Sequence, residues 1–275
     1  MMSPMPESST FVKASFVNSL RIQIRVIKAL CVRDIMGRFG REGLGFFWLF
    51  LEPALFTVGV TAVFALSPTM SHGHGPIPIS GFTLTGYSTV MLWRGLTGRL
   101  GQAVPSNKGL LYHRNVKVVD LIFSRAIVEI FACTTSLWFL TFVFVGVGLL
   151  PTLPVDPLKV LLGWFFYAWF CFATALIFAY LAAGSELFIR LSHVALYLAL
   201  PFMGGFFMVD WVPASLQRFY LMSPLVNAIE LLREGFFGEI IKAHYSISYL
   251  IKFNLILTLI GLILTRKIRR QLVET

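Results

Sequence analysis

The sequence contains apolar blocks of about 20 residues, separated by polar or glycine-rich segments, and this spacing limits the folds open to the chain. A helix that rises 1.5 Å per residue needs about 20 residues to cross the ~30 Å hydrocarbon core of a bilayer. The blocks are continuously apolar and lack the period-two alternation of a membrane β-barrel. We therefore predict an all-α polytopic membrane protein with six transmembrane helices. Their expected positions are 45–66, 82–103, 121–150, 158–183, 191–209 and 247–265.

The positions of Lys and Arg predict the orientation of these spans. Seven precede the first span, three lie between the second and third, and four follow the last, whereas segments 67–80 and 151–157 contain none. The positive-inside rule then places both termini in the cytoplasm, with 266–275 as a basic tail. Charged residues make up only 13% of the chain, so its formal charge of +10 indicates contact with anionic lipid and argues against binding to nucleic acid.

The N-terminal segment 1–44 is predicted to be cytoplasmic and to contain an amphipathic interfacial helix. Over Phe11–Asp34 the apolar residues recur at spacings of three and four, which is typical of a helix lying along a membrane surface. The apolar face comprises Val12, Phe16, Leu20, Ile24, Ile27 and Cys31. This pattern is consistent with a basic anchor and equally with a docking or gating element. Glycines between Gly37 and Gly45 then permit a bend into the first span.

Several charged residues fall within predicted spans. Glu52 would stand ~10 Å into the membrane, where a charge must face protein, water or a partner chain. Arg94 and Arg99 fall in the second span. Arg125 and Glu129 are four residues apart in the third, and this spacing predicts an ion pair. These residues predict a helix bundle with a polar interior.

The segment before the last span predicts two short re-entrant helices, at 211–239. Ser223 is a candidate N-cap, Pro224 suits the first helical position, and Gly235 or Gly238 can end the helix. A helix of roughly 12–14 residues is too short to span a bilayer. Its apolar face would comprise Leu225, Ile229, Leu232 and Phe236. The alternative is a pair of amphipathic helices resting on the outer surface.

The sequence contains no motif for catalysis or nucleotide binding. A P-loop, a G-x-S-x-G elbow and an H-E-x-x-H helix are all missing, so we predict neither an enzyme nor a cofactor in this chain. His72 and His74 form only a weak partial metal site, and we assign no metal.

Three segments carry a family resemblance: RDIMGRFGREGLGFFWLFLEP (33–53), NKGLLYHRNVKVVDLIFSRAIVE (107–129) and MSPLVNAIELLRE (222–234). They resemble the signature segments of ABC-2 type export permeases, and most of all the capsular polysaccharide permeases of KpsM type. The resemblance implies that 45–265 is an ABC-2 transmembrane domain. It also implies a homodimer bound to two separate ABC ATPase subunits, which hold ATP and Mg.

The resemblance assigns roles to two groups of residues. ATPase coupling is implied for Arg33, Arg38, Arg41, Glu42, Lys108, Tyr112, Arg114 and Lys117. A gate at the outer end is implied for Pro213, Pro224, Asn227, Glu230 and Arg233. The implied cargo is a lipid-linked, often acidic polysaccharide crossing the bacterial inner membrane. It would pass to a periplasmic co-polymerase and an outer-membrane export protein.

Aromatic rings and cations within the spans are candidates for the path of such a cargo, because sugar C–H faces stack on rings and an acidic polymer is attracted to arginine. The candidates are Tyr87, Trp93, Arg94, Arg99, Trp164, Tyr167 and Trp169. Each aromatic side chain could instead be a lipid anchor. Alternative functions are export of another lipid-linked glycan (O-antigen or teichoic acid) or of a small amphiphile, and a non-transporting scaffold for polysaccharide synthesis.

Overall fold

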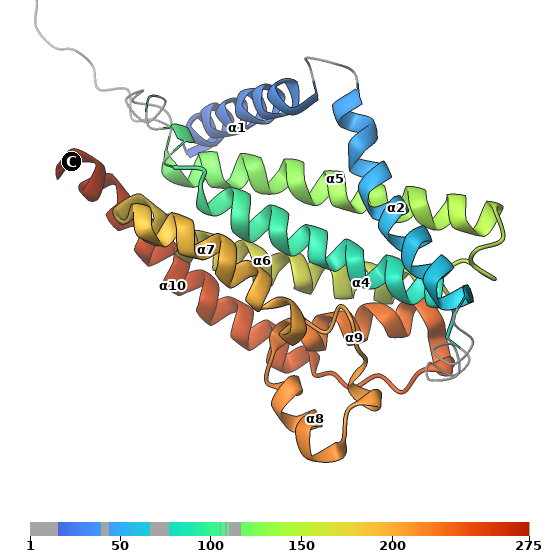
Figure 1. Cartoon of the computed structure of the whole chain (residues 1–275). Helices are drawn as coiled ribbons and strands as arrows, with labels where there is room; N and C mark the ends of the chain where they lie inside the picture. Colours follow the sequence, from blue (N-terminus) through green and yellow to red (C-terminus); the bar gives the residue numbers. More distant parts are fainter. Residues whose placement is uncertain are drawn as a thin grey trace, which may run out of the picture.

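A computed structural model of the protein describes residues 16–39, 44–66, 77–104, 106–107, 109 and 117–274. Every regular element in these ranges is a helix, which confirms the predicted all-α class. The long helices α4, α5, α6 and α10 run side by side, and α2 crosses them steeply (Figure 1). The helices are α1 Phe16–Phe39, α2 Leu44–Leu66, α4 Ile79–Trp93, α5 Val118–Gly146, α6 Pro157–Gly184, α7 Glu186–Leu198, α8 Ala214–Leu221, α9 Pro224–Phe237 and α10 Ile247–Glu274.

Four of the predicted spans coincide with the continuous helices α2, α5, α6 and α10. Within the described ranges, three helical stretches are long and apolar enough to cross a membrane: Val118–Gly146, Pro157–Gly184 and Ile247–Ile268. The start of α6 is fixed by Asp156, whose side chain accepts hydrogen bonds from the backbone N–H groups of Leu158 and Lys159. At the other end of the chain, α10 remains helical to Glu274, so most of the predicted basic tail extends the last helix.

The second predicted span changes its hydrogen-bond pattern midway. α4 ends at Trp93 and continues as a π-helix over Arg94–Arg99. π-helical turns are rare and occur frequently at functional sites. Three glycines let other helices approach this stretch closely: a Cβ on Gly98 would lie 3.0 Å from a side chain of α7, and one on Gly101 3.1 Å from a side chain of α6. A Cβ on Gly95 would overlap a side chain of α5.

The predicted span 191–209 does not form one continuous helix. α7 begins earlier, where the Ser185 side chain accepts a hydrogen bond from Phe188 N, and it contains only 13 residues. A 3₁₀ turn over Leu200–Phe202 follows it, with Pro201 inside. Gly204 then adopts a φ of +77°, which turns the chain away from the helix axis. Proline and glycine therefore interrupt a segment whose composition alone is apolar enough for a span.

The helix α9 is packed inside the bundle, mainly against α6. All its residues except Glu234 are buried, including the whole predicted apolar face. Two glycines allow the close approach: a Cβ on Gly163 of α6 or on Gly235 of α9 would lie 2.5 Å from a backbone nitrogen of the opposite helix. By contrast, α8 buries none of its residues. The alternative of two helices resting on a surface therefore does not describe α9.

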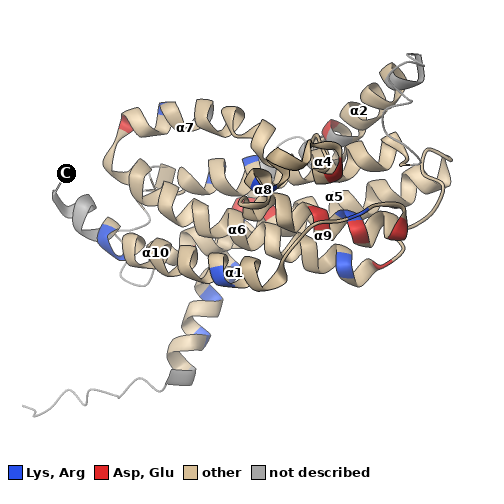
Figure 2. Ribbon diagram, turned by 90° about the horizontal axis from the view of Figure 1, so that it is seen from below, with Lys and Arg blue, Asp and Glu red and all other residues tan. Residues whose placement is uncertain are grey.

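The helix α1 packs against the beginning of α5 through polar contacts. Gln23 donates a hydrogen bond to the Asp120 carboxylate, and the Cys31 thiol donates one to Ser124 O at 3.5 Å. The predicted apolar face is only partly used, since the Leu20 side chain is 50% exposed. Figure 2 shows Lys and Arg along α1 and near the C-terminal end of α10, while most of α6 carries no charge.

Candidate transport site

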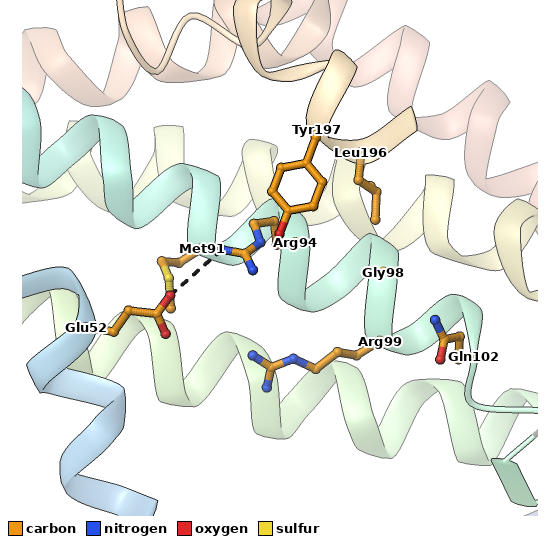
Figure 3. Close-up of a pocket in the computed structure, with 8 residues that line it drawn as sticks. All are labelled: Glu52, Met91, Arg94, Gly98, Arg99, Gln102, Leu196 and Tyr197. Carbon is orange, nitrogen blue, oxygen red and sulfur yellow. Dashed lines mark ion pairs between the residues drawn. The ribbon is translucent and has the colours of Figure 1, made fainter. Parts of the chain in front are cut away.

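A polar pocket of about 230 Å³ lies between α2, the π-helical segment and α7 (Figure 3). It is lined by Glu52, Met91, Arg94, Gly98, Arg99, Gln102, Leu196 and Tyr197. Two guanidinium groups and one carboxylate therefore share a cavity contributed by three separate helices. Such an arrangement is suited to an anionic ligand.

The Arg94 guanidinium is loosely held. Its Nη1 lies 3.8 Å from Glu52 Oε1, and the side chains are 40% and 35% exposed. Its Cζ lies 5.4 Å from the centroid of the Tyr197 ring, a cation–π contact. In the described part of the chain, this guanidinium donates no hydrogen bond. A pair of this exposure contributes about 0–1 kcal/mol, so Arg94 remains available to a stronger acceptor.

Glu52 has a second partner. The Tyr87 hydroxyl donates a hydrogen bond to Glu52 Oε1 at 3.2 Å, and the Tyr87 ring stacks on Phe56 at 4.0 Å between centroids. The carboxylate thus faces protein groups from α4, as its predicted depth in the membrane requires.

Arg99 is held by a buried group. Its Nη1 lies 3.5 Å from Glu129 Oε2, and the Glu129 side chain is only 3% exposed. Arg125, which the spacing predicts to pair with Glu129, has its Nε 3.8 Å from Asp34 Oδ1 on α1. Glu129 is turned towards Gly95, whose missing side chain makes room for the carboxylate. Arg125 also donates from Nη1 to Arg99 O at 3.4 Å, so both neighbours on α5 contact the π-helical segment, and Arg125 contacts α1 as well.

The aromatic path candidates do not lie together. Trp93 and Tyr167 are 7% and 0% exposed and belong to the hydrophobic core. Trp164 and Trp169 line a separate, largely apolar cavity of about 550 Å³ between α5 and α6. Their indole N–H groups donate to Thr134 and Thr258 at 2.8 and 2.9 Å. Of the predicted path residues, only Arg94 and Arg99 line the polar pocket, while Tyr87 contacts it through Glu52.

Three of the predicted gate residues, Asn227, Glu230 and Arg233, form one polar face of α9. Asn227 donates to Leu221 O and Ser223 O at 2.7 and 3.0 Å, and it accepts from Ser246 N at 3.0 Å. The Glu230 carboxylate accepts from Val209 N and His244 N, both at 3.2 Å. The helix α9 is thereby tied to the turn before it, to the connector after it and to the loop that precedes α8.

Arg233 completes this face. It is fully buried and donates to Gly204 O, Gly205 O and Phe207 O at 2.8, 2.7 and 2.6 Å. Its Cζ lies 4.2 Å from the centroid of the Phe82 ring on α4. Three carbonyl groups of one loop are satisfied by this one side chain, so Arg233 holds that loop between α4 and α9.

The two predicted gate prolines begin short helices. Pro213 precedes α8 and Pro224 occupies the first position of α9, although the Ser223 side chain makes no capping hydrogen bond. Near the end of α9, Lys159 and the Tyr245 hydroxyl bind Glu234 at 3.1 and 2.6 Å. Burial, followed by the hydrogen bond and charge of Glu234, raises the pKa of Tyr245 to about 12.

Two of the predicted coupling residues have described side chains. Arg33 donates to Asn107 at 3.1 Å and so joins α1 to the segment after the π-helix. Lys117 is exposed and N-caps α5, where its backbone N–H bonds Asp120 at 3.0 Å. The side chains of Arg38, Arg41, Glu42, Lys108, Tyr112 and Arg114 lie outside the described part, as do His72 and His74.

Sequence reasoning missed two contributors to these sites. Tyr197 closes the pocket beside Arg94, and its only signal was an aromatic residue within an amphipathic segment. Gly86 faces the loop that Arg233 binds, and a Cβ there would overlap Gly205 O. A glycine inside an apolar helix is the signal for such a close approach.

Comparison with known proteins gives relatives over nearly the whole chain, although no family model matches. The capsule polysaccharide export inner-membrane protein CtrC of Neisseria meningitidis serogroup A is 36% identical over 250 residues, which cover 91% of this chain and 93% of the relative. BexB of Haemophilus influenzae, of the same description, is 34% identical over 254 residues (92% and 95%). The polysialic acid transport protein KpsM of Escherichia coli is 28% identical over 264 residues (90% and 95%).

Proposed function

The chain belongs to the family of capsule polysaccharide export inner-membrane proteins, and on this premise we propose that it is the permease of a capsular polysaccharide exporter. The observation that carries the proposal is the similarity to CtrC and BexB over more than nine-tenths of the chain. The apolar stretches long enough to cross a membrane support it.

The proposed topology has six spans in the inner membrane and both termini in the cytoplasm. The helices α8 and α9 form the re-entrant element at the outer end. In support, the beginning of α5 and the C-terminal end of α10 lie towards one end of the bundle, and α9 lies towards the other (Figure 1). This arrangement gathers the basic segments on one side, as the positive-inside rule requires.

The energy source in this proposal is external to the chain. Two copies of the permease bind two ATPase subunits, which supply the nucleotide site that the sequence lacks. The contact surface comprises the end of α1 and the segment 104–117, which the hydrogen bond from Arg33 to Asn107 connects. Beyond the membrane, the polymer passes to a periplasmic co-polymerase and an outer-membrane export protein.

The proposed cargo is an acidic, lipid-linked polysaccharide that passes the polar pocket. Arg94 supports this assignment, because its side chain is 40% exposed and its guanidinium makes no hydrogen bond in the described structure. In a strain lacking this chain, finished polymer should accumulate inside the cell, and expression of the wild-type chain should restore surface capsule. Loss of polymer synthesis itself would instead favour a scaffold.

The same strain tests the role of Arg94. We expect Arg94→Gln to reduce surface capsule by about tenfold or more, since one bidentate contact to an oxyanion is lost. Arg218→Gln, on the exposed surface of α8, is the matched control and should export normally. Full export by Arg94→Gln, at equal protein level, would remove Arg94 from the cargo path.

A further inference from the structure

Glu52 lies on the side of Arg94 that an anionic ligand would approach. Both side chains line the polar pocket, and Glu52 Oε1 is the carboxylate oxygen nearest to Arg94 Nη1 (Figure 3). The 3.8 Å separation is longer than a hydrogen bond. An internal carboxylate therefore occupies the position of a ligand without using the hydrogen-bonding capacity of the guanidinium.

An incoming oxyanion can form a better pair with Arg94 than Glu52 does. Phosphate and carboxylate groups accept two parallel hydrogen bonds from a guanidinium, at N–O distances of about 2.7–2.9 Å. Glu52 and Arg94 are both more than one-third exposed in this structure and are too far apart for a hydrogen bond, so their existing pair is weak. Displacement of Glu52 consequently exchanges a weak contact for a strong one.

Glu52 keeps a hydrogen-bond partner after it is displaced from Arg94. Its hydrogen bond from the Tyr87 hydroxyl is independent of Arg94. That bond comes from α4, so it keeps a polar partner beside Glu52 when Arg94 binds another acceptor. Release from Arg94 therefore does not strand the carboxylate in an apolar environment.

Arg99 differs from Arg94 in its partner, although its own side chain is 54% exposed. Its partner Glu129 is 3% exposed, and removal of the guanidinium would leave that carboxylate buried with less compensation. The pocket thus contains one arginine, Arg94, whose carboxylate partner is exposed, and one, Arg99, whose carboxylate partner is buried.

We propose that Glu52 is an intramolecular stand-in for an oxyanion of the cargo, and that a phosphate or carboxylate group replaces it on Arg94 during transport. The inference rests on the proposed function, because the oxyanion belongs to the exported glycolipid. Glu52 then makes binding to Arg94 selective for charge, because a compact anion can displace it and a neutral sugar cannot.

The test measures binding to the full-length chain in nanodiscs of zwitterionic lipid, by isothermal titration calorimetry. Polysialic acid oligomers probe a carboxylate source, dioctanoyl phosphatidylglycerol probes a phosphate source, and dextran is the neutral control. We expect Glu52→Gln to tighten binding of the preferred anion by about two- to fivefold, the range that removal of a weak competing pair allows. Arg94→Gln should abolish that gain, and Glu234→Gln, in the distant pair with Lys159, should change nothing.

The outcomes distinguish the exchange at Glu52 from the proposed cargo path through the polar pocket. Weaker or unchanged anion binding in Glu52→Gln, with Arg94→Gln still defective, would overturn the exchange and leave the cargo path intact. Unchanged binding of both anions in Arg94→Gln would overturn the path through this pocket together with the exchange. Glu52→Ala provides a second variant with the same expected sign, and a thermal melt of each variant verifies folding.

Discussion

Arg94 and Arg233 are the same side chain in two opposite surroundings. Arg233 is fully buried and gives three short hydrogen bonds to one loop, whereas Arg94 is 40% exposed and, among the residues that the structure describes, contacts only a distant carboxylate and a ring. An arginine whose donors are satisfied by backbone carbonyls fixes structure. One whose donors are unused is free to bind a ligand.

The helices that carry Arg233 and the partner of Arg94 also differ in how deeply they are buried. α9, which carries Arg233, is buried almost throughout, whereas α2, which carries the partner of Arg94, leaves many apolar side chains exposed. The comparison teaches that the α9 region serves as a fixed frame and that the polar pocket is the adaptable part. Stability measurements can test this division directly.

The largest effect is expected for Arg233→Ala. It would leave the carbonyls of Gly204, Gly205 and Phe207 without their donor, and loss of a buried charged partner costs about 3–5 kcal/mol. Thermal unfolding in detergent should show a clearly lowered Tm. Arg218→Ala, on exposed α8, is the control and should melt like the wild type. Equal Tm values for the two variants would contradict the structural role of Arg233.

A smaller loss is expected for Gly86→Ala. The new Cβ would overlap Gly205 O, so α4 and the loop must separate, at about 1–3 kcal/mol. Gly59→Ala on α2 is the matched control, because no atom lies within 4 Å of its Cβ position. Its better helix propensity should leave stability unchanged or raise it by up to about 1 kcal/mol. If Gly86→Ala lowers the free energy of unfolding and Gly59→Ala raises it, the contrast between the α9 region and α2 is strengthened.

The smallest effect on stability is expected for Arg94→Gln, within about 1 kcal/mol, since only a weak pair and a ring contact are lost. Arg99→Gln should cost more, because the buried Glu129 carboxylate loses a positive neighbour. Chemical denaturation of both variants measures the difference. A larger loss for Arg94→Gln than for Arg99→Gln would show that Arg94 is structural after all.

Much of the fold could be predicted from the sequence, because an apolar helix must match the thickness of a bilayer whatever its partners are. The error at 191–209 was avoidable, since Pro201, Gly204 and Gly205 were visible breakers inside an apolar run. The charged pairs were harder to predict. Spacing correctly put Arg125 and Glu129 one turn apart, but their partners, Asp34 and Arg99, depend on which helices pack beside α5.

Some site residues were predicted correctly and others were not, because the packing between helices decides which side chains meet. Asn227, Glu230 and Arg233 were grouped by the family resemblance, and their spacing of three residues places them on one face of a short helix. The aromatic candidates come from different helices, and packing between helices sent Tyr167 into the core and Trp169 to a separate cavity. Residues that share one helix can be grouped from sequence, whereas residues that meet across helices require the tertiary structure.

The wide helical turn after Trp93 decides how the two cations of the pocket are presented. In an α-helix, residues five positions apart point about 140° away from each other, so Arg94 and Arg99 would face nearly opposite sides. The i→i+5 hydrogen bonding of the π-helix instead stacks such positions roughly one above the other. The pocket therefore depends on this wide turn, because α-helical hydrogen bonding over the same residues would place the two cations on different faces without altering either arginine.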